Sequence, residues 1–482
     1  MRDFRSILNI IGFLLCIEAS AMMIPMFFDL FYNNQDWVQF LYSSLITFFI
    51  GIILFFSFRK KDVKIGIRQA FVLTISSWIL ISFFGAIPFV YSSASLTYTD
   101  AFFESVSGIT TTGATVIYNL ENLSEGILIW RSLLQWFGGI GIIVLAMAIL
   151  PTLQIGGMQL LHMEHDDPYE KTIPKVNKFV LELFLLYILL SVICGLLYYI
   201  FGMSGFDSII HSLTTISTGG FSNYNESIGY FNSFKIEIVS IFFMLIGSLP
   251  FVLYLQLIHK QKNSLIKDDQ IKLFFLILLV VIIFTTIWLN KNLSLELNFS
   301  FRNAIFNVTS ILTGTGYTTT NFSNWGSFGT VIMLIIMFIG GCAGSTTGGI
   351  KIFRLQILFR GAITQIKKLT KPHAVLVMRF NGKTVNENTY NSVMGFFFMY
   401  IFLFLFSAIC LSFFNIDFLT AFSAAASAIS NVGPGLGEII GPSGSYSSIN
   451  SGAKWILAVT MIIGRLEIFT VLVMLSINFW KN

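Results

Sequence analysis

The sequence has few charged residues and few cysteines. Asp, Glu, Lys and Arg together make up 11% of the 482 residues, whereas hydrophobic residues make up 55% and the mean hydropathy is +0.79. This composition excludes a soluble globular protein. The four cysteines stand singly in apolar segments, without zinc-like or disulfide-like spacing, and are expected to be small core residues.

Long apolar runs indicate a multi-pass membrane protein instead. A helix needs about twenty apolar residues to cross a bilayer. This criterion predicts ten spans, at residues 7–30, 37–58, 70–91, 127–150, 179–201, 234–258, 271–289, 329–341 with its continuation, 392–414 and 455–480. Four further apolar stretches, at 101–111, 208–217, 303–312 and 418–430, are too short to cross. Half-spans of this kind are typical of re-entrant helices, which survive where protein or a water-filled cavity surrounds them.

A short glycine loop follows each half-span. The loops are aligned on Gly113, Gly219, Gly316 and Gly433; one position earlier stand Thr112, Thr218, Thr315 and Val432, and two positions earlier Thr111, Ser217, Gly314 and Asn431. Six positions before the glycine stand Ser107, Leu213, Ser310 and Ser427, three of which agree. The recurrence predicts an all-α membrane protein with four pseudo-repeats of helix, pore helix, filter loop and helix around a central pore. The predicted divisions are 1–62 for two extra N-terminal helices, then 63–155, 156–262, 263–370 and 371–482 for the repeats.

These loops have the chemistry of a cation filter. A ring of inward carbonyls needs backbone angles that glycine reaches freely, and such carbonyls can replace the hydration shell of K⁺. The half-helices would aim the negative ends of their dipoles at the pore. One loop alone would be explained equally well as a helix C-cap. Four loops at matching positions favour the filter, with Thr111, Thr112, Gly113, Ser217, Thr218, Gly219, Thr315, Gly316, Asn431, Val432 and Gly433 as its K⁺-binding residues.

Charge asymmetry predicts the orientation. Most Lys and Arg residues fall in segments that share one side if both termini are cytoplasmic, as the positive-inside rule requires. The glycine loops then open to the outside together with many acidic residues, among them Asp100, Glu104 and Asp207, and we expect an acidic mouth that concentrates cations. The first span imitates a signal peptide ending at Ala19-Ser20-Ala21. Because the apolar run continues beyond it, we expect an uncleaved helix.

Two intramembrane features suggest a gate. Residues 340–349 contain five glycines and three hydroxyl residues, a composition that an ordinary helix does not tolerate. We expect a broken segment below the filter, although close helix packing through small residues is an alternative. Arg465 lies near the middle of the last predicted span and should face the pore or a buried acid. Glu467, two residues on, is a poor partner for it. The candidate gate residues are Gly340, Gly341, Gly344, Ser345, Thr346, Thr347, Gly348, Gly349 and Arg465.

Two other motifs resemble a nucleotide site and a metal site, but the sequence around them does not fit such sites. The glycines from Gly433 to Gly437 loosely imitate a dinucleotide fingerprint, but no strand precedes them, so we expect no nucleotide site in this chain. Residues 162–167, His-Met-Glu-His-Asp-Asp, imitate a metal cluster but are expected to be a solvated loop. A membrane-embedded enzyme using that cluster is a disfavoured alternative, and the chain is not expected to be an enzyme or to bind nucleic acid.

Over its whole length the sequence resembles the superfamily of K⁺ transporters of the Trk, Ktr and plant HKT type. The most specific segments are 107–115, 340–351, 431–437, 464–469 and the Gly156-Gly157-Met158-Gln159 loop. The two extra N-terminal spans are similar to the bacterial TrkH branch. The resemblance implies that the four central glycines line the K⁺ filter, that residues 340–349 form an intramembrane gate loop, and that Arg465 lies in the permeation path. All four glycines are present, whereas serine at the first would have suggested Na⁺ transport.

The resemblance also implies partners. Members of the family form homodimers and bind a cytosolic ring of TrkA-type subunits that carry NAD or ATP. The basic segment 351–383 would suit such a partner, although topology and contact with anionic membrane lipid explain it equally well. The resulting hypothesis is potential-driven K⁺ uptake across the bacterial inner membrane, with H⁺ or Na⁺ coupling left open. A Na⁺ or mixed-cation pathway is the alternative.

Overall fold

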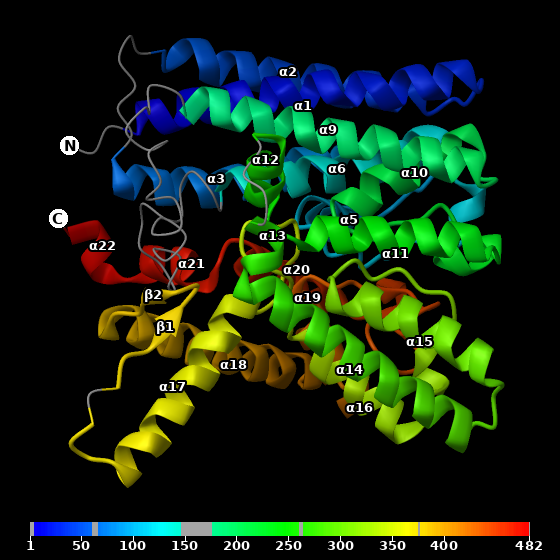
Figure 1. Cartoon of the computed structure of the whole chain (residues 1–482). Helices are drawn as coiled ribbons and strands as arrows, with labels where there is room; N and C mark the ends of the chain where they lie inside the picture. The colour runs from blue at the N-terminus through cyan, green and yellow to red at the C-terminus, as the bar shows by residue number, and fades with distance from the viewer. Residues whose placement is uncertain (1–3, 60–65, 146–175, 260–263, 375, 482) are drawn as a thin grey trace.

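The computed structural model describes residues 4–59, 66–145, 176–259, 264–374 and 376–481. Helices dominate it (Figure 1). The described sheet structure is one small antiparallel hairpin of β1 (Arg379–Phe380) and β2 (Lys383–Thr384). The protein is therefore essentially all-α, as predicted.

Seven helical stretches among the described residues are long and apolar enough to cross a membrane. They are α1 (Arg5–Phe31), α2 (Trp37–Ser57), α3 (Ile67–Gly85) continued by α4 (Ile87–Tyr91), α6 (Glu125–Val144), α9 (Val176–Ile200), α14 (Asp269–Asn292) and α18 (Glu387–Ser412). Each overlaps a span predicted from the sequence, because runs of about twenty apolar residues are a strong signal.

Two predicted spans are not continuous helices. The span at 234–258 divides into α11 (Phe234–Ser248) and α12 (Phe251–Ile258), which are bent by 92°. Pro250 lies at this bend, where it lacks an N–H and holds the residue before it in extended backbone. The last span divides into α20 (Ser451–Arg465) and α21 (Ile468–Leu475), bent by 110°, and is followed by α22 (Ile477–Lys481). Counting each bent pair as one span gives up to nine among the described residues, so these two spans lie where the sequence predicted them but contain breaks that it did not predict.

The predicted eighth span is also interrupted. It consists of α16 (Gly326–Met337), a non-helical segment and α17 (Ile352–Thr370). Helix α17 extends away from the bundle, next to the β1–β2 hairpin (Figure 1). A short helix, α13 (Ser264–Lys267), leads into α14.

Four short helices among the described residues, which we call the half-length helices, each end at one of the glycine loops. They are α5 (Tyr98–Ile109), α10 (Gly205–Ile216), α15 (Leu297–Leu312) and α19 (Phe418–Ser430). Three of them begin at a side-chain cap, in which Thr97, Ser204 or Asp417 accepts a hydrogen bond from a backbone N–H in the first helical turn. Each is preceded by a long helix and followed by a glycine loop and a second helix, so the same order occurs four times. The domain boundaries remain a prediction.

The N-terminal hairpin of α1 and α2 packs on the outside of this arrangement, with α1 against α3 and α6. Its connecting end is fastened by carboxylates. Asp29 Oδ1 accepts a hydrogen bond from Gly126 N at 2.7 Å, and Asp36 accepts from Ser93 N and from Ser124 Oγ. Both contacts reach the segments that flank the first half-length helix. The two extra helices are therefore attached to the first repeat.

Candidate functional site

The four glycine loops make the same backbone turn. As each half-length helix ends, one residue adopts positive φ, and a glycine two positions later does so again. The first residues are Thr111, Thr218, Gly314 and Asn431, and the glycines are Gly113, Gly220, Gly316 and Gly433. Between them, the backbone N–H of Thr112, Gly219, Thr315 and Val432 donates to the carbonyl oxygen of Ser107, Thr214, Ser310 and Ser427, respectively. The loops thus share one geometry despite different sequences.

This geometry corrects the predicted alignment of the second loop by one residue. The positive-φ glycine there is Gly220, whereas Gly219 matches Thr112, Thr315 and Val432. Ser217, a predicted filter residue, lies outside the turn at the end of α10, where its hydroxyl donates to the Leu213 carbonyl. With this register, all four repeats carry a hydroxyl residue at the position of Ser107. The sequence misled because two adjacent glycines can be aligned either way.

The loops close into a ring in which each repeat contacts the next. A side-chain carbon built on any of the four positive-φ glycines would overlap a carbonyl oxygen of a neighbouring loop. The pairs are Gly113 with Gly219 O, Gly220 with Thr315 O, Gly316 with Val432 O and Gly433 with Thr112 O. Any side chain here would be both strained and obstructed. The backbones of neighbouring loops therefore come close enough to form a closed ring only because these four positions are glycine.

Hydroxyl and amide groups reinforce the ring. Asn431 Nδ2 donates to Thr112 Oγ1 at 2.9 Å, which links the fourth loop to the first. Thr112 Oγ1 also lies 2.7 Å from Thr110 Oγ1, and Thr315 Oγ1 lies 2.9 Å from Thr313 Oγ1. All these side chains are buried. Apart from Ser217, every predicted filter residue lies in this ring.

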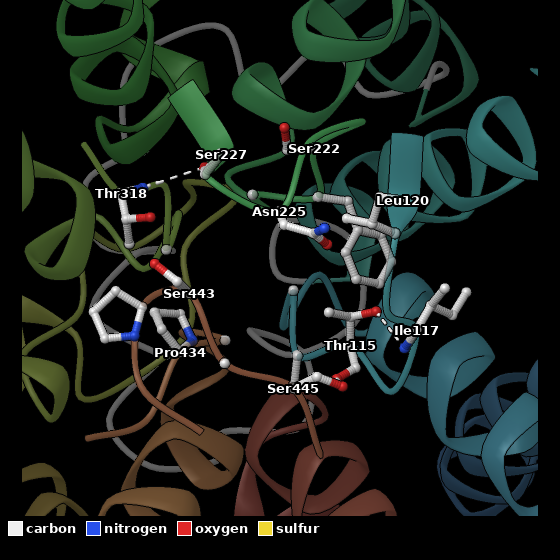
Figure 2. Close-up of a pocket in the computed structure, with 18 of the residues that line it drawn as sticks. Thr115, Ile117, Leu120, Ser222, Asn225, Ser227, Thr318, Pro434, Ser443 and Ser445 are labelled. Carbon is white, nitrogen blue, oxygen red and sulfur yellow. Dashed lines mark hydrogen bonds between the residues drawn. The ribbon is translucent and has the colours of Figure 1, made fainter. Parts of the chain in front are cut away.

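A cavity of about 70 Å³ opens next to the ring and is lined by residues of all four loops (Figure 2). We call it the vestibule. Among the described residues, its lining combines backbone with hydroxyl, aromatic and aliphatic side chains, the Asn225 amide and the Arg131 guanidinium, and it includes no carboxylate. Glu104 is fully buried beside it and pairs with Arg131, and Asp207 is also buried. The acidic mouth predicted from the sequence is therefore not what lines this cavity.

Arg131 and Glu104 form a buried support for the first two loops. Arg131 Nε donates to Glu104 Oε1 at 2.8 Å, and its Nη1 donates to the carbonyl of Ser222 at 3.0 Å. Glu104 also accepts from Thr115 Oγ1 and from Val116 N. From the sequence, Arg131 is one of the few basic residues expected on the outer side. Its position near the start of a long apolar helix gave no sign of its partner.

Tyr446 supports the fourth loop. Its hydroxyl donates to the Gly433 carbonyl at 3.1 Å, and its backbone N–H donates to the Thr115 carbonyl at 2.9 Å. Burial raises the pKa of Tyr446, so the hydroxyl keeps the proton that it donates. This contact joins the fourth loop to the first.

The predicted gate segment, residues 340–349, is not helical and is almost wholly buried. Ile339 and Ile350 at its ends form a parallel bridge, so the segment closes on itself as a loop. The expected break in the helix is confirmed, and close packing of an intact helix is excluded. We refer to residues 340–349 as the gate loop.

The gate loop occupies the bend between α11 and α12. Cys342 N donates to the Ser248 carbonyl at 2.9 Å, Thr346 N donates to the Gly247 carbonyl at 3.1 Å, and Phe251 N donates to the Gly344 carbonyl at 3.0 Å. The loop thus satisfies backbone groups that the bent helix leaves without partners. It also touches the ring, because Thr218 Oγ1 donates to Thr346 Oγ1 at 3.0 Å.

Three buried cations lie next to the gate loop. Arg465 Nη1 donates to the Thr346 carbonyl at 2.9 Å, and Lys351 Nζ donates to the Thr347 carbonyl at 2.6 Å. Arg354 pairs with Glu467 at 2.7 Å, and its guanidinium lies 3.7 Å from the centre of the Phe396 ring. The expectation that Glu467 does not pair with Arg465 is therefore confirmed.

Arg465 is only 3% exposed, yet no carboxylate within the described ranges forms an ion pair with it. Its Nε and Nη2 atoms likewise have no hydrogen-bond partner there. It is the last residue of α20, at a break, and not the middle of a continuous helix as predicted. The alternative in which Arg465 anchors a buried ion pair finds no partner in the described part of the chain.

The remaining motifs give no competing site among the described residues. No group of three or more His, Cys, Asp or Glu side chains that could hold a metal ion occurs in those ranges. The cluster at 162–167 and the loop at 156–159 lie outside them. The glycines from Gly433 to Gly437 belong to the ring and to the segment that borders the vestibule.

Comparison with known proteins agrees with this architecture. Residues 38–481 match the family model TrkH, described as a cation transport protein. The sequence is 38% identical to the Trk system potassium uptake protein TrkI of Halomonas elongata, covering 100% of this chain and 98% of the relative. It is also 38% identical to TrkH of Escherichia coli K12, over 99% and 100% of the two chains. The crystal structure of the potassium transporter TrkH from Vibrio parahaemolyticus superposes with a TM-score of 0.93, at 36% identity over the full length of both chains.

Proposed function

Because this chain belongs to the TrkH family of cation transport proteins, we propose that it takes up K⁺ through the ring of its four glycine loops. The relatives named above are Trk-system potassium uptake proteins, and they match along the whole chain. The single observation that carries the proposal is the closed ring, in which each positive-φ glycine meets a carbonyl of a neighbouring repeat.

The ring has the parts that cation selection needs. In the proposed mechanism, a K⁺ ion enters from the vestibule and exchanges its water for backbone oxygens at the ring. The four half-length helices end at the loops, so the negative ends of their dipoles favour a cation there without supplying a fixed charge. Because the residues of the ring carry no charged side chain, the ion can leave the ring again. An inward-negative membrane potential contributes about 2.3 kcal/mol per charge per 100 mV to uptake.

We further propose that the gate loop and Arg465 control passage below the ring. The loop contacts Thr218 of the ring, and Arg465 holds the Thr346 carbonyl of the loop. A cation that left the ring on this side would meet a buried positive charge. Displacement of Arg465 together with the loop would open the path.

The cellular setting is part of the proposal. We place the chain in a bacterial inner membrane with both termini cytoplasmic, which is the arrangement that its basic segments favour. A homodimer and a TrkA-type cytosolic ring carrying NAD or ATP are proposed from the family resemblance. Helix α17, which carries Lys367 and Lys368 in its last turn, extends from the bundle and offers a surface for such a partner.

The proposal is tested by growth of a bacterium that lacks its own K⁺ uptake systems. We expect the intact gene to restore growth at low K⁺, and a ring variant that is present in the membrane at equal amount to fail. Growth that depends on added Na⁺ and not on K⁺ would favour the Na⁺ pathway. No rescue by well-expressed protein, with or without a TrkA-type subunit, would contradict K⁺ uptake.

A further inference from the structure

Gln135 occupies a position in the ring that no motif indicated. It lies on α6, one helical turn after Arg131, and is fully buried. Its side-chain Nε2 donates to the Gly219 carbonyl at 2.6 Å, and its Oε1 accepts from Phe221 N at 3.0 Å. The amide therefore pairs with the peptide groups on both sides of Gly220, in the way a neighbouring strand would.

The same side chain explains why the second loop has two adjacent glycines. Gly219 does not adopt positive φ, so backbone conformation alone does not require glycine there. A carbon built on Gly219 would instead overlap the side-chain amide of Gln135. The other three loops carry Thr112, Thr315 and Val432 at this position. The Gln135 amide thus fills, from a neighbouring helix, the space that a residue's own side chain fills elsewhere.

The Gly219 carbonyl that Gln135 holds also forms part of the contact between the first and second loops. Gly219 O is the oxygen that faces Gly113 of the first loop, so its orientation sets the spacing between the first two repeats. Loss of the amide would free the peptide to rotate and leave two buried backbone groups without partners. Carbonyl orientation at a filter decides which ion is coordinated.

We propose that Gln135 is a specificity-determining positioning residue, whose side-chain amide fixes the second loop of the ring and replaces the side chain that Gly219 lacks. This inference rests on the proposed K⁺ uptake, and it assigns selectivity to a residue of α6 outside the loops. It also predicts that a side chain at position 219 is tolerated when the Gln135 side chain is shortened, because both would fill the same space.

The first test is Gln135→Met, which keeps the length of the side chain but removes both hydrogen bonds. K⁺ and Na⁺ fluxes are measured in proteoliposomes, normalised to folded protein, with the melting temperature of the same preparation. The K⁺/Na⁺ flux ratio should fall about tenfold, as expected when two side-chain hydrogen bonds no longer hold the ring. Ser132→Ala is the matched control, because Ser132 is buried on the same helix and its hydroxyl donates to the Ile129 carbonyl. Its ratio should remain that of the wild type.

The second test is a compensating pair. Gly219→Thr alone should lower folded yield, because its side chain overlaps Gln135. Gly219→Thr combined with Gln135→Ala should restore yield and recover most of the K⁺ preference. A wild-type flux ratio in Gln135→Met, an equal loss in Ser132→Ala, or no rescue by the pair would overturn the inference. Absence of K⁺ flux in the wild type would instead contradict the proposed function itself.

Discussion

Replacement of Arg465 by alanine tests the proposed gate most sharply, because the structure separates two opposing effects. Arg465 is buried, donates one hydrogen bond to the Thr346 carbonyl, and has no carboxylate partner in the described ranges. A unit positive charge about 4 Å from a passing cation costs about 4 kcal/mol at an effective dielectric near 20. Removing a barrier of this height would raise the rate of cation passage roughly a thousandfold.

The expected effect on stability is small. Loss of a charged hydrogen bond costs about 1.5–3 kcal/mol, but the variant no longer buries an unpaired charge, whose desolvation costs several kcal/mol. The two terms oppose each other. We therefore expect Arg465→Ala to raise flux strongly, weaken its regulation and leave the melting temperature close to that of the wild type.

The assay is Rb⁺ flux in proteoliposomes together with the melting temperature of the same preparation. Arg354→Ala is the control, because Arg354 pairs with Glu467 and its removal strands a buried carboxylate, at a cost of about 3–5 kcal/mol. The control should melt markedly lower. A lower melting temperature without higher flux in Arg465→Ala would refute the barrier and assign Arg465 a purely structural role.

Three further predictions follow from the ring and the gate loop. Gly113→Ser should sharply reduce the preference for K⁺ over Na⁺, measured as relative Rb⁺ and Na⁺ uptake, because its side chain would overlap the Gly219 carbonyl; unaltered selectivity would remove Gly113 from the filter. Gly220→Ala should impair selective uptake severely, since positive φ and the Thr315 carbonyl both exclude a side chain, and a variant with wild-type uptake would contradict the corrected register. Deletion of residues 343–347 should raise flux per reconstituted molecule if the loop obstructs the pore, whereas lower folded yield without higher flux would make it a packing element.

Much of this architecture could be predicted from the sequence. Helix α19 has the predicted bounds, Phe418–Ser430, and the other half-length helices differ from the prediction at their ends. The length and apolarity of these segments suffice to predict half-length helices, because an apolar segment too short to cross a membrane must end within it. The interruption of the span that contains residues 340–349 was also predicted, since repeated glycines do not sustain a helix.

Other features could not be predicted, for identifiable reasons. The alignment of Gly219 and Gly220 depends on φ, which two adjacent glycines do not reveal. The break after Arg465 has no proline, and Glu467 adopts positive φ there although it is not glycine. The pairing of Arg131 with Glu104 joins residues on different helices. Such contacts depend on how helices pack, and a single sequence carries little information about that.

The most direct test of the central claim is the ion preference of the intact chain. Initial rates of K⁺, Rb⁺ and Na⁺ uptake are measured at equal concentrations, in K⁺-depleted cells that lack other K⁺ uptake systems and express either the wild type or Gly220→Ala. The account predicts that the wild type takes up K⁺ and Rb⁺ well ahead of Na⁺, and that Gly220→Ala, present at equal amount in the membrane, loses this preference. Equal rates for K⁺ and Na⁺ in the wild type, or an unchanged preference in the variant, would contradict it.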